Sequence, residues 1–209
     1  MKIFFTESES GLSPIEAEKM GVVLIKKFYV YKGEAYPIEH KPIENEIDEK
    51  QITTTDCSMD EYKNYFKPYI GNELIYVAHH RKITSALENL EGQKIPGLTI
   101  IETGFLGPAM IEVLKRVMNG KTYDDIRCFM VLKNPEKKAR FMTTEKYNLI
   151  EVKNGEFEVI RKCDSKYAAV QLLKKHVNQP LIYGKDLNIG LRLHLGREFV
   201  GGVWKDDSI

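Results

Sequence analysis

Hydrophobic and polar positions along the first two thirds of the chain follow two periods, one typical of strands and one typical of helices. Apolar runs of strand length occupy residues 2–6, 22–31, 72–78 and 97–104. Between them, apolar residues recur at helical spacing, as in Met110, Val113, Leu114 and Val117. Alternating strands and helices favour an α/β fold with a mainly parallel sheet and helices on both faces.

Capping signals place the start of two helices. Ser13 with Glu16 and Ser58 with Glu61 each have the spacing of a capping box, so we expect helices over residues 14–20 and 59–69. Thr122 and Asp125 are expected to open a further helix, with an apolar stripe formed by Ile126, Phe129 and Met130. The run at residues 139–144 predicts a fifth strand.

The last third of the chain has a different pattern. Asn154-Gly155 separates two alternating segments, which indicates a β-hairpin. A helix is expected at residues 166–177, followed by three short strands at residues 180–186, 190–196 and 198–204. The pattern therefore predicts an α/β domain over residues 1–147 and a small α+β lid domain over residues 148–209.

Composition excludes several classes of partner. The 209 residues include 31 basic and 30 acidic side chains, for a net charge of +1, so no nucleic acid partner is expected. No apolar run approaches the ~20 residues that span a bilayer, so no membrane insertion is expected. The scattered Cys57, Cys128 and Cys163 form neither a metal pair nor a disulfide framework, which favours the cytoplasm. Without a dinucleotide fingerprint or a P-loop, we expect no cofactor.

The stretch "ITTTDCS", residues 52–58, is the most informative polar segment. It lies just before a predicted helix, where free backbone N–H groups and the helix dipole favour an anion. Thr54, Thr55 and Ser58 therefore form a candidate anion site. Alternatively, these hydroxyls only cap the helix and satisfy the backbone of the loop. Cys57 in this position is also a possible nucleophile, although no base accompanies it in the sequence.

Other polar residues follow predicted strands, where parallel sheets bind their ligands. Thr6 ends the first strand, and His79-His80 follow the third. One of these histidines is a candidate acid–base group or phosphoryl acceptor, which would make the protein a small-molecule enzyme or phospho-carrier; a surface role is the alternative. His194, in the predicted strand at residues 190–196, is either structural or turned towards the threonines.

The order of these segments resembles the DegV family of bacterial fatty-acid-binding proteins. "FFTESESGL" is similar to the family's "TDSTADL", and "ITTTDCSMDEY" to its "TTSQPSPGEF". "IETGFLGPAMIEVLKRVMNGKTYDDI" and "EVKNGEFEVIRK" resemble two later family segments, and "IGLRLHLGREFVGGVW" resembles the closing "IGAHTGPGAVGIAF". No single motif is specific, but their order extends over nearly the whole chain.

The resemblance implies a non-enzymatic lipid-binding protein with a buried acyl chain. The residues expected to bind the long-chain fatty acid at its carboxylate are Thr54, Thr55, His80, His194, Thr6 and Ser58. Some family members present the fatty acid to a separate fatty acid kinase subunit. Three features depart from the family: His79-His80 replaces two serines, Asp56 replaces a glutamine, and the second domain is shortened.

Overall fold

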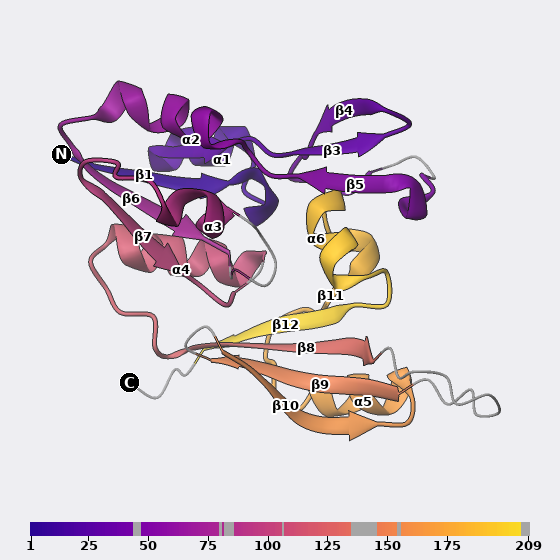
Figure 1. The fold of residues 1–209 in the computed structure, drawn as a ribbon. Coiled ribbons are helices and arrows are strands. Elements are labelled where there is room, and N and C mark those ends of the chain that lie inside the picture. The colour runs from indigo at the N-terminus through magenta and orange to yellow at the C-terminus, as the bar shows by residue number, and fades with distance from the viewer. Residues whose placement is uncertain are drawn as a thin grey trace.

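The fold was determined as a computed structural model that describes residues 1–43, 47–79, 81, 86–105, 107–134, 146–153 and 156–205. Four parallel strands form the first sheet, in the order β2 (Val22–Ile25), β1 (Lys2–Glu7), β6 (Glu73–Ala78) and β7 (Leu98–Glu102). Helices cover both of its faces (Figure 1). The predicted α/β class is therefore confirmed.

Alternation along the strands explains the two layers of helices. On one face, Phe4 and Val77 share a core with α1 (Pro14–Met20) and α4 (Pro108–Met118). On the other face, Phe5 and Tyr76 share a core with α2 (Met59–Phe66) and α3 (Ala86–Glu91). Because neighbouring strand residues point to opposite sides, each strand supplies both cores.

The predicted capping boxes are both present. Ser13 and Ser58 each accept a hydrogen bond from the backbone N–H three residues on, and Glu16 and Glu61 bond back to the capping residues. α1 ends at Gly21, whose φ of 69° lies in the left-handed region that glycine adopts without strain. The expected helix over residues 59–69 is present, but its last turn, η3 (Lys67–Tyr69), is a 3-10 helix rather than an α-helix.

The apolar run at residues 22–31 is two strands rather than one. β2 ends at Ile25, and β3 (Phe28–Tyr31) belongs to a separate antiparallel sheet in the order β4-β3-β5. β4 (Glu34–Pro37) returns from β3 through Lys32-Gly33, whose φ values of 51° and 83° suit a tight hairpin turn. The division occurs because Lys27 turns into the interior, where it is 2% exposed.

The second large sheet is antiparallel and contains a strand where a helix was expected. Its order is β10 (Glu156–Cys163), β9 (Lys146–Lys153), β8 (Ile126–Asn134), β12 (Val200–Lys205) and β11 (Ile182–Tyr183). The prediction of a helix from Thr122 was wrong. Cys128 and Met130 pack on one face of β8, and Phe129 and Val131 pack on the other. Because both faces are buried, apolar and polar residues do not alternate along this strand.

Helix α5 (Lys166–Leu173) covers this sheet as expected. β9 and β10 pair in antiparallel fashion, as the predicted hairpin requires, and Asn154-Gly155 between them lies outside the described residues. The predicted strand at residues 190–196 was wrong, because this segment is helix α6 (Ile189–Leu195). Asn188 caps it by accepting a hydrogen bond from the backbone N–H of Leu191. Leu191 and Leu195 then face the main core, whereas Ile189 and Leu193 face the small sheet, a spacing that only a helix provides.

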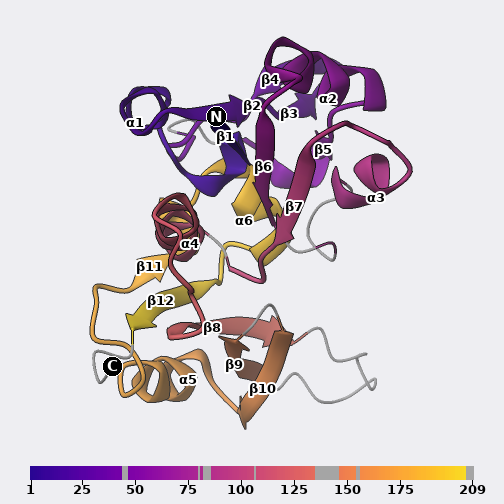
Figure 2. The same ribbon diagram turned by 90° about the vertical axis from the view of Figure 1, so that its left-hand side faces the viewer.

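Helix α6 lies where the three sheets meet (Figures 1 and 2). The carboxyl ends of β1, β6 and β7 point towards it in Figure 1. The division into domains at residue 147 stays a prediction, and β8 already belongs to the five-stranded sheet. The expected strand at residues 139–144 lies outside the described residues. Among the described helices, none has the length and apolar character of a bilayer-crossing segment.

Candidate functional site

A buried ionic cluster occupies the carboxyl edge of the parallel sheet. The ammonium of Lys27 lies 3.2 Å from a carboxylate oxygen of Glu7 and 3.2 Å from one of Glu9, and it also contacts Asp56. Lys27, Glu7 and Glu9 are each 2% exposed or less. We call these four residues the Lys27 cluster. It links β1, the β2–β3 connection and the segment before α2.

Burial and the attraction between opposite charges shift the pKa values in the Lys27 cluster in opposite directions. Burial alone raises the pKa of Glu7, but the charge of Lys27 and hydrogen bonds from His79 and Tyr76 outweigh it and lower that pKa to about 2. For Lys27, burial lowers the pKa, and the carboxylates of Glu7, Glu9 and Asp56 raise it above the ordinary value. One ammonium therefore faces three carboxylates at the sheet edge.

His79 adjoins the Lys27 cluster at the end of β6 and is fully buried. Its Nδ1 lies 2.7 Å from the Glu7 carboxylate, which also accepts a hydrogen bond from the hydroxyl of Tyr76. Its Nε2 is buried and has no hydrogen-bond partner among the described residues. A buried polar atom without a partner is uncommon in native proteins and calls for an explanation.

The arrangement also brings together potential metal ligands. Oxygen atoms of Glu7 and Glu9 and a ring nitrogen of His79 lie within 4.8 Å of one another. The Lys27 ammonium, however, already contacts both carboxylates. A metal ion would have to displace this buried cation, so the geometry favours Lys27 as the resident positive charge.

The predicted threonine site is a strand rather than a loop before a helix. Thr53, Thr54 and Thr55 belong to β5 (Ile52–Thr55), which pairs with β3. Thr54 lies opposite Tyr29. Side chains in this relation share a face, and Tyr29 packs with Ile52 and Ile189, so Thr54 faces α6. No partner is present for the Thr54 hydroxyl in the part of the chain that the structure describes.

Three other predicted hydroxyl ligands already bond to the protein. Thr6 donates to the carbonyl of Val77 at 3.0 Å, and Thr55 donates to the carbonyl of Phe28 at 3.4 Å. Ser58 caps α2 and donates to Glu61 at 2.8 Å. These three hydroxyls therefore already satisfy the protein's own backbone or helix cap.

The two remaining predicted ligands have different outcomes. His194 is exposed on α6, one helical turn after Gly190, which lies against the Glu9 carboxylate. The predicted strand there was wrong, and the part of His194 in ligand binding stays a prediction. His80 lies outside the described residues.

Asp56 and Cys57, two residues of the predicted anion site, have other roles in the structure. Asp56 contacts the Lys27 ammonium, and the nearby Arg81 bonds to Glu102 at 2.7 Å. Cys57 is not an activated thiol. Burial and the nearby Glu61 raise its pKa to about 11, and its Sγ donates to the Lys26 carbonyl at 3.2 Å.

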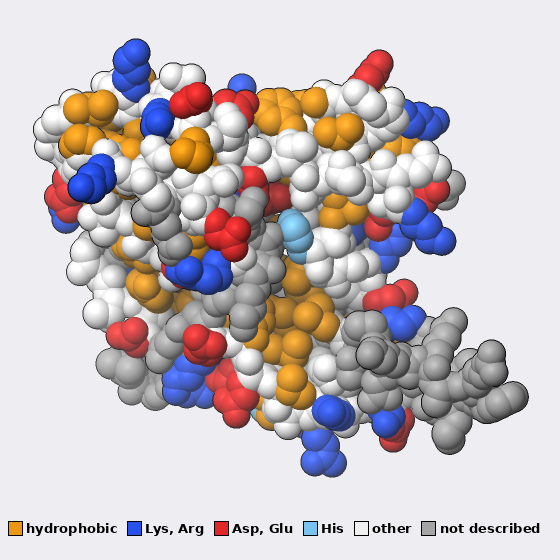
Figure 3. All heavy atoms as spheres, viewed as in Figure 1, with side chains coloured by type: hydrophobic (Ala, Val, Ile, Leu, Met, Phe, Trp, Pro, Cys, Tyr) orange, Lys and Arg blue, Asp and Glu red, His pale blue; other side chains and the backbone are white. Residues whose placement is uncertain are grey.

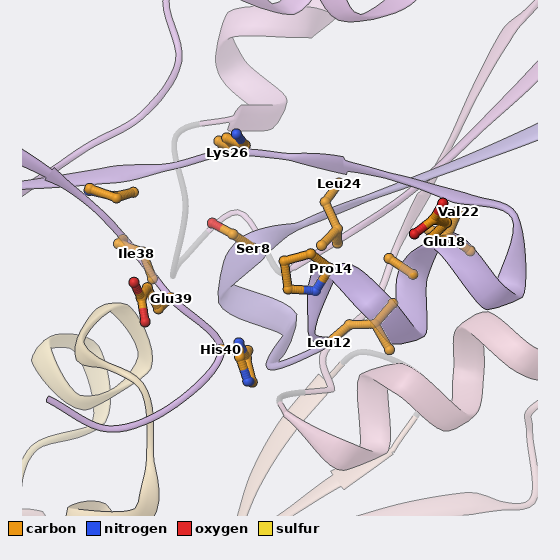
Figure 4. A pocket seen from close by; sticks show the side chains of 12 residues that line it. Ser8, Leu12, Pro14, Glu18, Val22, Leu24, Lys26, Ile38, Glu39 and His40 are labelled. Atoms are coloured by element: carbon orange, nitrogen blue, oxygen red, sulfur yellow. The ribbon is translucent and has the colours of Figure 1, made fainter.

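A cavity of about 590 Å³ opens beside the Lys27 cluster (Figure 4). We call it the α1–β2 cavity. Apolar side chains form one end, among them Leu12 just before α1, Pro14 of α1 and Leu24 of β2, with Glu18 beyond them. The other end carries Ser8, Lys26 and the segment that leaves β4, Ile38, Glu39 and His40. Ser8 directly follows Glu7, so the cavity reaches the carboxyl edge of β1. Thr54 and Thr55 do not line it.

A smaller cavity of about 270 Å³ lies on the other side of the segment that leaves β4. Pro37 and Glu39 line both cavities, and Tyr29, Tyr36 and Ile189 are among the other residues that line the smaller one. Figure 3 shows hydrophobic side chains gathered in a hollow in the middle of one face, between the parallel sheet and the five-stranded sheet. The region where the sheets meet thus offers apolar surface next to charged groups.

Sequence reasoning missed the Lys27 cluster and the α1–β2 cavity. A signal existed for the cluster. Lys26-Lys27 interrupts an otherwise apolar run, and "TESES" places two acidic residues directly after a buried strand. An adjacent lysine and carboxylates in apolar surroundings indicate a buried ion pair, because isolated charges are rarely buried.

Comparison with solved structures identifies proteins of the same fold. A DegV family protein from Thermus thermophilus, described by its fatty acid binding, has a TM-score of 0.68 at 12% identity over 98% of this chain and 99% of that one. A stearic-acid-binding protein from Eubacterium ventriosum has a TM-score of 0.64 at 12% identity over 98% of each chain. DegV from Bacillus subtilis, a fatty acid binding protein, has a TM-score of 0.62 at 12% identity over 97% of each chain.

No protein-family model matches the sequence, and neither does any curated protein. The likeness to the solved structures nevertheless extends over almost all of both chains in each comparison. At 12% identity, it establishes how the chain folds. The expectation drawn from the sequence is confirmed at that level: this protein has the fold of the DegV family.

Proposed function

We propose that the protein binds one long-chain fatty acid, with the acyl chain in the α1–β2 cavity. The observation that carries this proposal is the cavity itself, about 590 Å³ with one apolar end and one polar end, at the carboxyl edge of the sheet. Ligand pockets typically measure about 300–1,000 Å³. Proteins of the same fold are described as binding fatty acids, stearic acid among them, which supports this choice of ligand class.

The acyl chain would supply most of the affinity. Each methylene group removed from water contributes ~0.8 kcal/mol, so a dozen would contribute ~10 kcal/mol before the entropy of association is subtracted. Leu12, Pro14, Ala17, Val22 and Leu24 would provide the apolar contacts. The polar end of the cavity would then direct the head group towards Ser8 and the sheet edge.

The head group is proposed to lie between β5 and α6. Thr54 faces α6 with a hydroxyl that has no partner among the described residues. His194 is exposed on α6, one helical turn after Gly190. Thr6, Thr55 and Ser58 are weaker candidates because their hydroxyls bond to the protein. The carboxylates of Glu7, Glu9 and Asp56 would repel an anion placed close to the Lys27 cluster.

Mass spectrometry of lipids extracted from the purified protein tests the proposal. We expect one long-chain fatty acid per chain, and the delipidated protein is expected to bind added hexadecanoic acid. A protein that carries no acyl ligand and binds none when offered a series of chain lengths would contradict it.

Presentation of the fatty acid to a kinase subunit is a further part of the proposal. His194 is exposed, so a partner that approaches the edge between β5 and α6 would reach the proposed head group. Incubation of the loaded protein with a fatty acid kinase subunit and ATP is expected to give an acyl phosphate that hydroxylamine traps. If free fatty acid is phosphorylated equally well without the protein, presentation is excluded.

The second candidate function is an enzyme or phospho-carrier that uses His79. The Glu7–His79 hydrogen bond of 2.7 Å resembles the carboxylate–imidazole pairs that orient a general base. However, the ring is fully buried, and in the described structure no hydroxyl or thiol bonds to it. Turnover that is lost in His79→Ala while lipid binding persists would favour this alternative.

A further inference from the structure

We propose that two copies of this protein associate through β10, the strand Glu156–Cys163 at one edge of the five-stranded sheet. In this dimer the two β10 strands run antiparallel about a two-fold axis that passes between Val159 and Ile160. The two five-stranded sheets then form one continuous sheet. Because the interface lies on β10, the dimer does not require a bound lipid.

The outer edge of β10 is open. Among the described residues β10 pairs with β9 only, so its other side presents backbone N–H and C=O groups that have no strand partner there. Figures 1 and 2 show β10 on the side of the molecule away from the parallel sheet. Val159 and Ile160, at the middle of the strand, are 48% and 39% exposed. A strand edge that carries exposed apolar side chains is a template for a further strand.

The charges of β10 identify a second copy as that strand. Glu156 and Glu158 precede the middle of β10, Arg161 and Lys162 follow it, and all four side chains are exposed. An antiparallel pair about the midpoint places Glu158 of each copy opposite Arg161 of the other, so the attraction occurs twice. Parallel pairing would instead place like charges side by side, which is unfavourable.

A β-bulge in β10 fixes the register of this pairing. Glu158 lies opposite Glu151 of β9. Three residues further along β10, Arg161 lies opposite Leu149, which is only two residues from Glu151. Residues two apart in a strand share a face, so Glu158 and Arg161 point to the same face of the sheet, and Ile160 is the extra residue between them. Without the bulge, the two charges would point to opposite faces and could not meet across the axis.

The bulge also lies on the proposed axis. A bulge bends its strand, and an edge strand that bends alone is a poor partner for a straight one. A two-fold axis between Val159 and Ile160 brings the two bulges together, so both strands bend at the same point. The same residues therefore disfavour a regular strand from an unrelated protein and suit a second copy of β10.

Glu158 gains a partner that its own chain does not supply. Its neighbour across β9 is Glu151, a like charge, and Glu151 already forms an ion pair with Arg127 at 3.3 Å. Neither Glu158 nor Arg161 has an ion-pair partner in the described part of the chain. Like charges directly opposite in a sheet are destabilising, so a guanidinium on the outer side of Glu158 relieves this repulsion.

Sedimentation velocity of the full-length protein over a series of concentrations tests the proposal. We expect a monomer–dimer equilibrium with a dissociation constant of about 1–100 μM, typical of a small interface. Glu158→Arg and Arg161→Glu each place like charges in both contacts, so each is expected to weaken dimerisation at least about tenfold. Glu88→Arg is the matched control, because Glu88 is exposed on α3 of the parallel sheet, and dimerisation should stay within about twofold.

A mixture of the two β10 variants separates a lost contact from a lost fold. One copy with Glu158→Arg and one with Arg161→Glu again place opposite charges in both contacts. The mixture is therefore expected to form a dimer although neither variant does so alone. The double variant Glu158→Arg/Arg161→Glu is expected to self-associate for the same reason.

The wild-type protein gives a decisive readout even if the variants fold poorly. Hydrogen exchange of the β10 backbone amides is expected to slow as the protein concentration rises through the dissociation constant. A wild-type protein that stays monomeric at every concentration would overturn the proposal. So would a dimer in which β10 exchange is unchanged, or one that Glu158→Arg does not weaken, because either result places the interface elsewhere.

Discussion

Gly190 of α6 lies directly against the carboxylate of Glu9, so that a Cβ atom at position 190 would be 2.3 Å from Oε1. The amide of Asn188 also donates to the Glu9 carbonyl at 3.1 Å. Through these contacts α6 is seated on the carboxyl edge of the parallel sheet. Glu9 cannot withdraw easily, since its other carboxylate oxygen contacts Lys27 at 3.2 Å.

Gly190→Ala is therefore expected to destabilise the protein by about 1–3 kcal/mol, because the added methyl group overpacks a site whose neighbours are fixed. Urea unfolding at constant m-value measures the change. Gly92→Ala is the matched control, since nothing lies within 4 Å of its Cβ position, and a shift under about 0.5 kcal/mol is expected there. Equal shifts in the two variants would disprove the tight contact.

Lys27→Met removes the only ammonium that contacts Glu7 and Glu9 among the described residues. Loss of one member of a buried ionic group leaves the other charges uncompensated, and we expect a loss of about 3–5 kcal/mol at pH 7. Lys26→Met, at the neighbouring exposed lysine, should change the free energy of unfolding by less than about 0.5 kcal/mol. If Lys27→Met is as stable as wild type, the cluster contributes nothing to folding.

The pKa of Glu7 predicts how stability depends on pH. This pKa is about 2 in the folded protein and has an ordinary value of 4.5. A lowered carboxyl pKa stabilises the fold above the ordinary value, and the contribution disappears as pH falls from about 4.5 to about 2. Unfolding by urea at successive pH values should show this loss. Glu7→Gln should have a flatter profile in that window, and an unchanged profile would assign the acid sensitivity to other carboxyl groups.

Local signals in the sequence were sufficient for many elements of the fold. The capping boxes at Ser13 and Ser58 depend on neighbouring residues, and both are present. β8 and α6 were predicted wrongly because tertiary contacts determine them. β8 is buried on both faces, and the alternating pattern of α6 is produced by contacts with two different cores.

The candidate site was predicted less completely, for the same reason. The sequence indicated His194 and Thr54, which lie on α6 and β5, and their part in ligand binding stays a prediction. It gave no spacing that links Lys27 to Glu7, Glu9 and Asp56, because these residues meet only when the sheet forms. Hydroxyl side chains such as Thr6 could not be assigned, since a ligand and a backbone carbonyl are equivalent acceptors.

Thr54→Val tests the proposed head-group site with little change in shape. If the Thr54 hydroxyl bonds to the lipid, the dissociation constant for hexadecanoic acid should rise about 2- to 12-fold, the effect of losing one net hydrogen bond. Thr53→Val is the control, because Thr53 is exposed on the opposite face of β5 and should leave binding unchanged. An unchanged dissociation constant for Thr54→Val would remove Thr54 from the site.

Leu24→Trp tests whether the α1–β2 cavity holds the acyl chain. Leu24 is half-buried at the apolar end of the cavity, and an indole in its place would occupy space that the chain requires. We expect affinity for hexadecanoic acid to fall at least about tenfold, and shorter acids to be affected less, because a shorter chain still fits the remaining volume. The control is Ile15→Trp on α1, whose side chain is 65% exposed and does not line the cavity. Calorimetric titration across chain lengths measures both variants, and equal losses for short and long acids would place the acyl chain elsewhere.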